Sequence, residues 1–290
     1  MEEIGSSEKD LLLYDVDWNE VWRERMRLHR SSASFTDSLH VWKDEDNARR
    51  YEKTARKGYG KRIRDTLEGL SVTSGTRVLD IGSGPGTIAI PLAKRVGEIT
   101  AVEPAAGMVN VLKERIAEEG IKNIRIVKSD WEDVDIERDL EGMYDIVIAS
   151  LSLNMTDMRE AARKMNAVCS GTVNLYWFAD MPFWERNYSE VWPKMHGSSY
   201  HPGPKVDCLF MLLCQMGIYP DVTMMPLDKE YRFSRPEEMF DHFRARFGVT
   251  TDHQEDVMRR HLLAKARREN GCLVLSGDTT YARISWRVGR

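Results

Sequence analysis

Short apolar runs alternate with amphipathic stretches through the middle of the chain. Runs typical of strands buried on both faces occur at residues 77–81, 99–103, 124–128, 144–151 and 172–178. Between them, apolar positions recur with helical spacing at residues 87–96, 107–119 and 158–167. Pro91 lies inside the first of these helices and should kink it slightly. Repeated strand and helix units predict an α/β fold, a mostly parallel sheet with helices on both faces.

The N-terminal segment has a different pattern. Trp18, Val21, Trp22 and Met26 are spaced to share one face of a short amphipathic helix. Residues 41–64 follow as a charged helical stretch, with nine Lys or Arg and four Asp or Glu residues. We expect residues 1–65 to form a helical lid that closes over a ligand bound to the core.

The regular alternation ends after residue 180. Residues 181–228 are rich in Trp, Tyr and Met and are long for a connection after the fifth strand, so we expect residues 181–233 to form a cap over the core of residues 66–180. Ser234 and Pro236 mark the start of a helix that ends near Phe247, and another helix is expected at 251–269. Residues 272–276 and 281–288 predict a terminal hairpin, which would make residues 234–290 the last part of the core.

Composition narrows the class of protein. The 290 residues include 42 Lys+Arg and 46 Asp+Glu, for a net charge of −4, and 42% are hydrophobic. These values are typical of a folded enzyme-sized protein and give no global attraction to nucleic acid. An acidic, polar start and the lack of a run of about 18 apolar residues favour a cytoplasmic protein without a membrane partner. The four cysteines form no C-x-x-C pair, so we expect free thiols and no metal site.

The clearest motif is VLDIGSGPGT, which begins at Val78 and joins a predicted strand to a predicted helix. Its glycines allow a tight turn and a close approach of the backbone to a ligand. Asp80 stands two residues before the first glycine, where it would repel the pyrophosphate of a dinucleotide. A ligand with an ammonium group would be attracted there, and S-adenosylmethionine (SAM) carries one.

Two more acids follow the next strands. Glu103 ends the second strand and can accept hydrogen bonds from ribose hydroxyls, and Asp130 ends the third strand, where it can accept from an adenine amino group with Trp131 against the ring. The carboxyl ends of parallel strands share one edge of a sheet, and open α/β sheets bind ligands at that edge. The spacing of the acids therefore favours a SAM site.

At these residues the chain resembles the class I SAM-dependent methyltransferases, which are Rossmann-like. The resemblance covers about residues 76–180, through VLDIGSGPGT, AVEP, SDWED and YDIVIASLSL. It implies a seven-stranded sheet in the order 3-2-1-4-5-7-6 with the last strand antiparallel, helices on both faces, SAM as cofactor and S-adenosyl-L-homocysteine as product. The cofactor contacts that it implies are Asp80, Gly82, Ser83, Gly84, Glu103, Pro104, Met108, Asp130, Trp131, Ser150 and Leu151.

Methyl transfer needs a nucleophile in line with the methyl group, and some acceptors must also lose a proton. His196 and His201, in the cap, are our candidates for a base, although both also suit a structural role there. Asn154 and Asp157 lie nearer the fourth strand but are typical helix-capping residues. The aromatic residues expected to wall an acceptor cavity, or simply to pack in a core, are Trp177, Trp184, Tyr188 and Tyr200.

These features favour a methyltransferase for a small molecule held in an enclosed, aromatic-walled cavity. The basic residues within 43–64 leave open a methyltransferase for RNA or for a protein side chain. A SAM-binding protein without catalytic activity is the third alternative. The acceptor, the pathway and the oligomeric state are not readable from the sequence.

Overall fold

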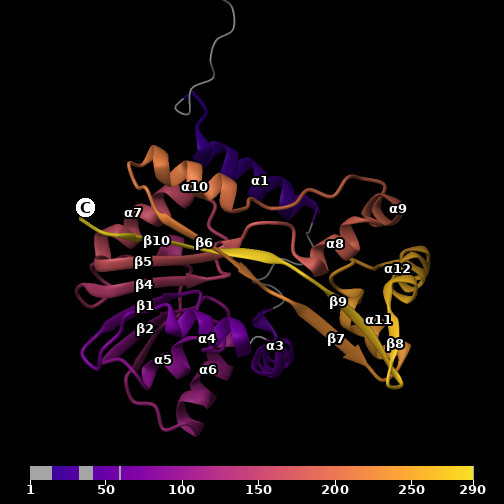
Figure 1. The fold of residues 1–290 in the computed structure, drawn as a ribbon, viewed down its shortest axis with the longest axis horizontal. Coiled ribbons are helices and arrows are strands. Elements are labelled where there is room, and N and C mark those ends of the chain that lie inside the picture. The colour runs from indigo at the N-terminus through magenta and orange to yellow at the C-terminus, as the bar shows by residue number, and fades with distance from the viewer. Residues whose placement is uncertain (1–14, 33–41, 59, 290) are drawn as a thin grey trace, which may run out of the picture.

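The computed structural model describes residues 15–32, 42–58 and 60–289. Its centre is a seven-stranded sheet in the order β3-β2-β1-β4-β5-β10-β6 (Figure 1). The strands are β1 (Arg77–Ile81), β2 (Glu98–Val102), β3 (Ile124–Val127), β4 (Tyr144–Ser150), β5 (Cys169–Phe178), β6 (Asp221–Pro226) and β10 (Thr280–Arg287). Strands β1 to β5 pair in parallel, and β10 is antiparallel to β5 and β6. The expected order of strands is therefore confirmed.

Both faces of the sheet are buried, because successive side chains of each strand point to opposite faces. Leu79 and Val147 pack with α1 (Trp18–Ser32), α7 (Met158–Val168) and α10 (Val206–Gln215) on one face. Val78 and Ile146 pack on the other face with α5 (Ala89–Ala93), near α4 (Gly60–Glu68) and α6 (Ala106–Glu118). The apolar runs that predicted two-sided burial therefore lie in the core.

The predicted amphipathic face of α1 is confirmed. Trp22 and Met26 are 0% and 3% exposed, and Trp18 and Val21 pack against the same core cluster. The indole Nε1 of Trp22 donates to the carbonyl oxygen of Met155 at 2.8 Å. The charged stretch becomes α3 (Glu45–Gly58) and α4, whereas residues 1–14 and 33–41 of the expected lid lie outside the described residues.

Helix α5 is shorter than the pattern predicted. It begins at Ala89, so Pro91 lies in its first turn, where a proline is tolerated. The slight kink expected at Pro91 stays a prediction. The helix after Ser234 also begins later, at Pro236, and the Ser234 hydroxyl donates to the Glu238 carboxylate.

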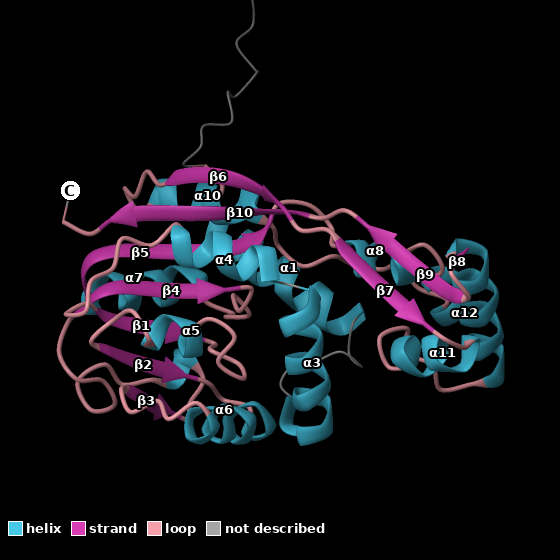
Figure 2. Ribbon diagram, turned by 60° about the horizontal axis from the view of Figure 1, so that its bottom comes forward, coloured by secondary structure: helices cyan, strands magenta, loops and turns pink. Residues whose placement is uncertain are grey.

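A second, three-stranded sheet lies beyond the carboxyl ends of the parallel strands. It pairs β9 (Cys272–Gly277) with β7 (Lys229–Phe233) and β8 (Arg267–Glu269). With α8 (Phe183–Ser189), α9 (Trp192–His196), α11 (Pro236–Arg244) and α12 (Asp252–Lys265) it forms a body that we call the extension. Figure 2 shows the arrowheads of β2 and β4 pointing toward α3 and this extension.

The predicted terminal hairpin is wrong, because β9 pairs with β7 and β8 while β10 pairs with β5 and β6. Strands β6 and β7 follow each other along one side of a ribbon, and β9 and β10 follow each other along the other. The amide of Leu227 donates to the Thr279 carbonyl at 2.7 Å where the two halves meet. We call this continuous pair of strands the ribbon, and it joins the core to the extension (Figure 1).

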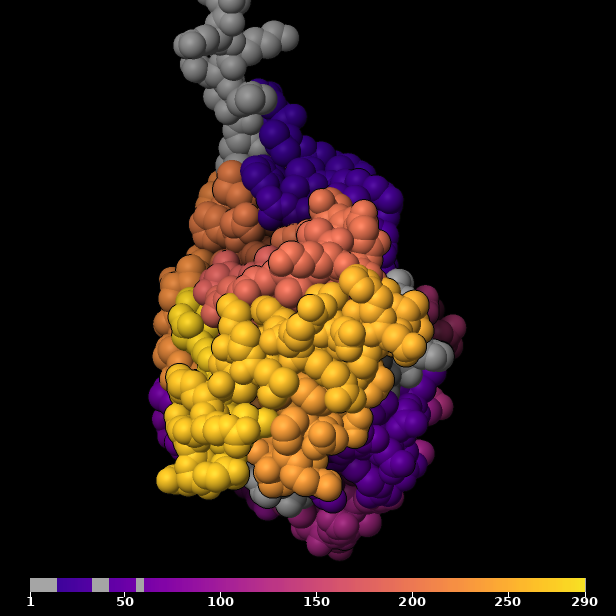
Figure 3. Space-filling view, turned by 90° about the vertical axis from the view of Figure 1, so that its right-hand side faces the viewer, coloured from indigo at the N-terminus to yellow at the C-terminus, as the bar shows by residue number. Residues whose placement is uncertain are grey.

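Residues 181–228 contribute to both the core and the extension. Helices α8 and α9 pack in the extension, whereas α10 packs on α1 and α7 and β6 is the edge strand of the main sheet. In the space-filling view toward the extension, the residues of α8 and α9 lie between those of α1 and those near the C-terminus (Figure 3). The added structure therefore comes from two separate segments of the chain.

Replacing Gly277 tests the contact between the ribbon and α8. A Cβ added at Gly277 would lie 2.1 Å from Cδ2 of Phe183, so we expect Gly277→Ala to destabilise the fold by about 1–3 kcal/mol. Urea unfolding followed by tryptophan fluorescence measures the change. Gly75→Ala is the matched control, because its nearest heavy atom would be 3.9 Å away. Equal stability of the two variants would contradict this packing.

Candidate functional site

The glycine loop after β1 is held by its neighbours at the edge of the sheet. Gly82 has a φ of 69°, and its amide donates to the Val102 carbonyl at 2.8 Å. A Cβ at Gly82 would lie 2.3 Å from Cβ of Ser152, whose hydroxyl donates to the Ile81 carbonyl at 2.7 Å. Only glycine fits between the ends of β1, β2 and β4 at this position.

Glu103 fixes the next part of the loop. One carboxylate oxygen accepts from the Gly84 amide at 2.8 Å, and the other accepts from the Ala105 amide at 2.9 Å. Burial raises the pKa of Glu103, and the charge of Asp130 raises it further, against the effect of the two amides. Glu103 and Asp130 are therefore close enough to interact, as their positions at adjacent strand ends predicted.

Asp80 is the most deeply buried of the three acids, at 2% exposure. Burial raises its pKa to about 7, the charge of Glu103 contributes, and the guanidinium of Arg62 opposes the shift. Its Oδ2 is buried and accepts no hydrogen bond from the described residues. The buried Ser83 hydroxyl also has no hydrogen-bond partner among them. The three acids thus lie together, with polar atoms that are left for a ligand.

The end of β4 forms the adjoining side of the site. Leu151 has a φ of 58°, a conformation that is costly for a residue with a side chain and that often marks functional sites. Its amide donates to the Tyr176 carbonyl at 3.0 Å. Ser150 accepts from the Arg62 guanidinium at 2.7 Å. Both residues lie at the sheet edge where the sequence placed them.

Arg62 is a site residue that the sequence did not single out. It comes from α4, is 4% exposed, and reaches both the Ser150 hydroxyl and the surroundings of Asp80. In the sequence it was one of nine basic residues in a charged stretch, and a helical pattern alone does not show which of them turns inward. The structure shows that α4 covers this edge of the sheet through Arg62.

Three other predicted cofactor contacts have structural partners. Pro104 lies between Glu103 and Ala105 on the loop after β2, and Met108 packs against Ala48 of α3. Trp131 is 3% exposed, its Nε1 donates to the Ala161 carbonyl of α7, and the Lys164 ammonium lies 5.1 Å from its ring centre. The expected contact between Trp131 and an adenine ring does not fit this packing, because the indole is part of the core.

The two candidate bases are placed differently. His196 lies in the extension, with its ring centre 4.0 Å from that of Trp192 and its Nε2 bonded to the Phe247 carbonyl at 2.9 Å. Its Nδ1 also contacts Gln254, so this ring has a structural role and not the expected catalytic one. For His201 the contacts run through the backbone, and its role stays a prediction: its carbonyl accepts from a ring nitrogen of His29 at 3.1 Å.

His29 therefore lies against the backbone of His201, a contact that no signal in the sequence predicted. Its Nδ1 lies 3.4 Å from the Tyr200 hydroxyl, which donates to the Glu185 carboxylate at 2.8 Å. Glu185 is 5% exposed and also pairs with Lys205 at 3.4 Å. Burial lowers the pKa of His29, and the nearby charge of Glu185 opposes that shift. This polar cluster lies beside the end of β5, where Trp177 donates to the Pro204 carbonyl.

The aromatic residues expected to form one cavity divide into two groups. Trp177 and Trp184 both lie against Phe178 at the end of β5, with ring centres 5.4 and 5.6 Å from it. Tyr188 and Tyr200 lie 5.4 Å apart and pack in the extension. The first group is near the edge of the main sheet, whereas the second mainly stabilises the extension.

Two of the cavities among the described residues lie against α3. The larger, about 760 Å³, lies between α3, β7, β9 and α11, and the smaller, about 370 Å³, lies between α3, α4, α5 and α6. Neither is lined by Asp80 or Glu103. The sequence missed the larger cavity, although the alternation of Lys229, Tyr231 and Phe233 along one strand would have indicated a half-buried aromatic face.

The described residues contain no group of three or more His, Cys, Asp or Glu side chains that is arranged to hold a metal ion. The four cysteines are free thiols, three of them buried. In the same part of the chain, no helix combines the length and apolar character needed to cross a membrane.

Comparisons with known proteins agree with the fold and the loop. Residues 78–171 match the family model described as a methyltransferase domain. The chain is 33% identical over 85 residues to the Probable ribosomal RNA small subunit methyltransferase A of Methanosphaera stadtmanae, covering 29% of this chain and 30% of that protein. It is 26% identical over 168 residues to the ubiquinone/menaquinone biosynthesis C-methyltransferase of Legionella pneumophila (strain Paris), covering 53% of this chain and 58% of that protein.

The fold is also similar to the solved structure of the YcgJ protein from Bacillus subtilis. The TM-score is 0.51 at 18% identity, and the match covers 77% of this chain and 97% of that one. Each of the two curated relatives is matched over less than two thirds of its length. The sheet order, the glycine loop and the matched residues 78–171 define a methyltransferase domain. Residues 78–171 are thus similar to the methyltransferase domain family.

The cofactor of this family is SAM, and the residues present fit it. The buried Oδ2 of Asp80 accepts no hydrogen bond within the described residues. The methionyl part of SAM carries an ammonium group, which can donate that bond and has the opposite charge. Glu103 keeps lone pairs for ribose hydroxyls, since each of its oxygens accepts one amide hydrogen from the loop. Trp131 is the predicted cofactor residue that this arrangement does not support.

The raised pKa of Asp80 predicts that SAM affinity depends on pH. The ionised carboxylate binds the ammonium, so affinity should rise by about tenfold as the pH increases from about 6 to about 8 and Asp80 loses its proton. Isothermal titration calorimetry measures this change. Asp80→Asn keeps the shape of the side chain and should weaken binding at pH 8 and flatten the pH dependence. A wild-type affinity that is constant over this range would show that Asp80 does not hold the ammonium.

Proposed function

We propose that this chain is a SAM-dependent methyltransferase whose acceptor is a small molecule. The supporting observation is the cavity of about 760 Å³ beyond the carboxyl edge of the sheet, between the extension and α3. Its volume lies within the range of roughly 300–1,000 Å³ that is usual for small-molecule sites. The cofactor contacts in this proposal are those predicted from the sequence, without Trp131 and with Arg62 added.

When bound, SAM supplies a methyl group on a positively charged sulfur. The chain's own contribution is then largely positional. Asp80 would hold the methionyl ammonium and Glu103 the ribose hydroxyls beside the glycine loop, and α4 would cover them through Arg62. In this proposal the acceptor approaches from the side of the extension. Orientation of this kind can contribute roughly 7–11 kcal/mol to lowering a barrier.

The alternative acceptor, RNA, has support in the basic residues of α3 and in the name of the relative from Methanosphaera stadtmanae. In the structure, however, Arg49 of α3 pairs with Glu45 and with Glu114 of α6, both at 2.6 Å. Such pairs use the guanidinium to dock α3 on the core. This arrangement favours α3 as a covering helix and not as a surface for phosphates.

Turnover with fractionated acceptors tests the proposal. Purified protein is incubated with SAM and a low-molecular-weight extract, total RNA or a protein extract, and S-adenosylhomocysteine is measured. We expect formation with the low-molecular-weight fraction. Turnover confined to RNA and strongly reduced by salt would show that the acceptor is RNA and not a small molecule. SAM binding without turnover in any fraction would indicate a non-catalytic protein.

For acceptors that must lose a proton, we propose His29 as the base. Its Nδ1 donates to the His201 carbonyl, which leaves Nε2 with a free lone pair when the ring is neutral. The lowered pKa keeps the ring neutral at lower pH than an ordinary histidine. The rate should therefore persist as the pH falls through the usual histidine range and be lost only below it.

His29→Asn should lower turnover by about 100-fold or more while SAM affinity stays unchanged. The matched control is His253→Asn, since the ring of His253 also bonds a backbone carbonyl but lies on α12 in the extension. Turnover as a function of pH separates the two roles. Loss of a base should remove the fall in rate at low pH, whereas loss of a structural residue should lower the rate by the same factor at every pH. A wild-type rate in the His29 variant would exclude this assignment.

A further inference from the structure

Arg115 of α6 connects three separate parts of the core. Its Nη1 donates to the Pro85 carbonyl of the glycine loop at 2.9 Å, in a buried hydrogen bond. Its Nε lies 3.6 Å from a carboxylate oxygen of Glu52 on α3, and its Nη2 lies 3.4 Å from the carboxylate of Glu119, at the end of α6. Because a guanidinium is planar and rigid, its three nitrogens relate the loop, α3 and α6 to one another in one fixed geometry.

The bond to Pro85 acts on the loop from outside the cofactor edge. Gly84 and Gly86 flank Pro85 with φ values of 56° and 78°, and glycines restrict the backbone little, so contacts with neighbouring residues decide where the loop lies. One such contact is made by Glu103 at the cofactor edge, and the next is made by Arg115. Arg115 lines the smaller cavity, away from the acids. The position of the loop therefore depends on a residue that is not itself a predicted cofactor contact.

Helix α3 is docked closely on α6. A Cβ added at Gly107, in the first turn of α6, would lie 2.6 Å from the carbonyl oxygen of Trp42, so only glycine allows the chain that leads into α3 to lie there. Glu45, the first residue of α3, accepts from the Asn110 amide at 3.1 Å. With the pair between Glu52 and Arg115, these contacts join α3 to the helix that holds the loop.

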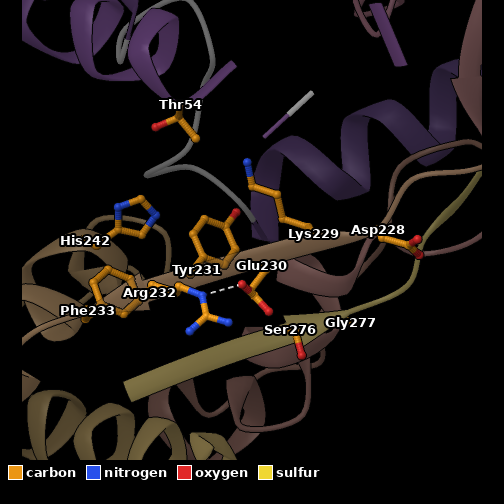
Figure 4. Close-up of a pocket in the computed structure, with 10 residues that line it drawn as sticks. All are labelled: Thr54, Asp228, Lys229, Glu230, Tyr231, Arg232, Phe233, His242, Ser276 and Gly277. Atoms are coloured by element: carbon orange, nitrogen blue, oxygen red, sulfur yellow. Dashed lines mark hydrogen bonds and ion pairs between the residues drawn. The ribbon is translucent and has the colours of Figure 1, made fainter. Parts of the chain in front are cut away.

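The same helix forms part of the larger cavity. In Figure 2, α3 stands between α6 and the extension. Thr54 of α3 lines this cavity together with Tyr231 and His242 of the extension (Figure 4). Thr54 lies only two residues after Glu52, so a shift of α3 that breaks the pair with Arg115 also moves this wall. The glycine loop and the larger cavity are thus connected through one helix.

We propose that Arg115 is a positioning residue that couples the docking of α3 to the binding of SAM. A loop held by Arg115 binds SAM more tightly, and bound SAM in turn strengthens the docking of α3, because coupling between two binding events is reciprocal. SAM thereby stabilises the α3 wall of the larger cavity. The inference rests on SAM as the cofactor and goes beyond the proposed function, since it makes no statement about the class of acceptor.

SAM affinity of the full chain, measured by isothermal titration calorimetry, tests the role of Arg115. Arg115→Met removes the guanidinium and keeps an unbranched chain, and it should weaken SAM binding by about tenfold, within the usual range of coupling between sites. The loss is expected because the Pro85 carbonyl is no longer held. Wild-type SAM affinity in this variant would overturn the proposal.

Glu52→Gln tests the coupling from the side of α3 and removes no buried cation. We expect SAM binding to weaken by about fivefold, although Glu52 does not contact the loop. Asp46→Asn is the matched control, because it removes the same charge from the first turn of the same helix, and it should leave SAM affinity unchanged. If Arg115→Met does not fold, this comparison decides alone. An equal affinity of the Glu52 and Asp46 variants would overturn the proposal.

A double-variant cycle shows whether Glu52 acts through Arg115. In the Arg115→Met background, Glu52→Gln should cause no further loss of SAM affinity, because the pair is already broken. Losses that simply add would show that the two residues act independently, which would overturn the proposal.

Hydrogen exchange separates coupling from a purely structural role. In the wild-type chain, SAM should slow the exchange of the α3 amides, and this slowing should be lost in Glu52→Gln at saturating SAM. The amides of β1 and β4 should stay protected in both, which controls for the fold. No effect of SAM on α3 in the wild type, or the same effect in Glu52→Gln, would overturn the proposal.

Neither measurement uses an acceptor, so the two proposals can fail separately. Coupling of α3 to SAM without turnover of any acceptor would uphold this inference and reject the proposed enzyme. Turnover of a small molecule by a chain whose α3 does not respond to SAM would uphold the proposed function and reject the coupling.

Discussion

Parallel pairing of β1 with β2 and β4 is the constraint on which the site depends. In this register Ile81 pairs with Val102 on one side and with Ala149 on the other, so the three strands end together. The residues that follow are therefore brought to one place: the glycine loop, the Glu103 carboxylate and the strained Leu151. Asp80, one residue before the end of the central strand, is buried from both sides as a result. Its raised pKa is the electrostatic consequence of that position.

Acidic and basic side chains are concentrated in different parts of the molecule. Acids gather at the ends of β1, β2 and β3, where a ligand with an ammonium and a sulfonium would lie, whereas the bases Lys229 of β7 and Arg246, after α11, act on each other in the extension. Arg62 stands between the two regions and acts on both.

The main sheet was predictable because its signals are local. Each strand of the parallel part is an apolar run, and each acid follows directly on a strand, so the order of elements places the acids at one edge. Other features depend on contacts between distant segments. His29 meets the backbone of His201 across 172 positions, and Arg62 is distinguished from its basic neighbours only by the direction of its side chain. Trp131 followed the family's pattern, but its indole was needed to pack against α7.

The predicted hairpin failed for a related reason. Gly277 and Asp278 are good turn residues, but a turn signal gives a bend and does not give the partner of either strand. Here β9 ends at Gly277 and β10 begins at Thr280, and the two strands pair in different sheets. The sequence of β7 alternates between buried and exposed residues, as in a strand with one buried face. Recognition of β7 as a strand would have indicated a partner for β9 and, with it, the extension.

The ribbon has one more consequence for the way the two bodies relate. Its two strands cross from core to extension side by side, joined at the crossing by the bond from Leu227 to Thr279. A pair of bonded strands resists shear along its length but twists and bends readily about the point where the pairing changes. Any swing of the extension toward or away from the sheet must therefore bend the ribbon at residues 227–228 and 278–279. The width of the cavity between β7, β9, α11 and α3 thus depends on torsion angles at this crossing as well as on the side chains that line it.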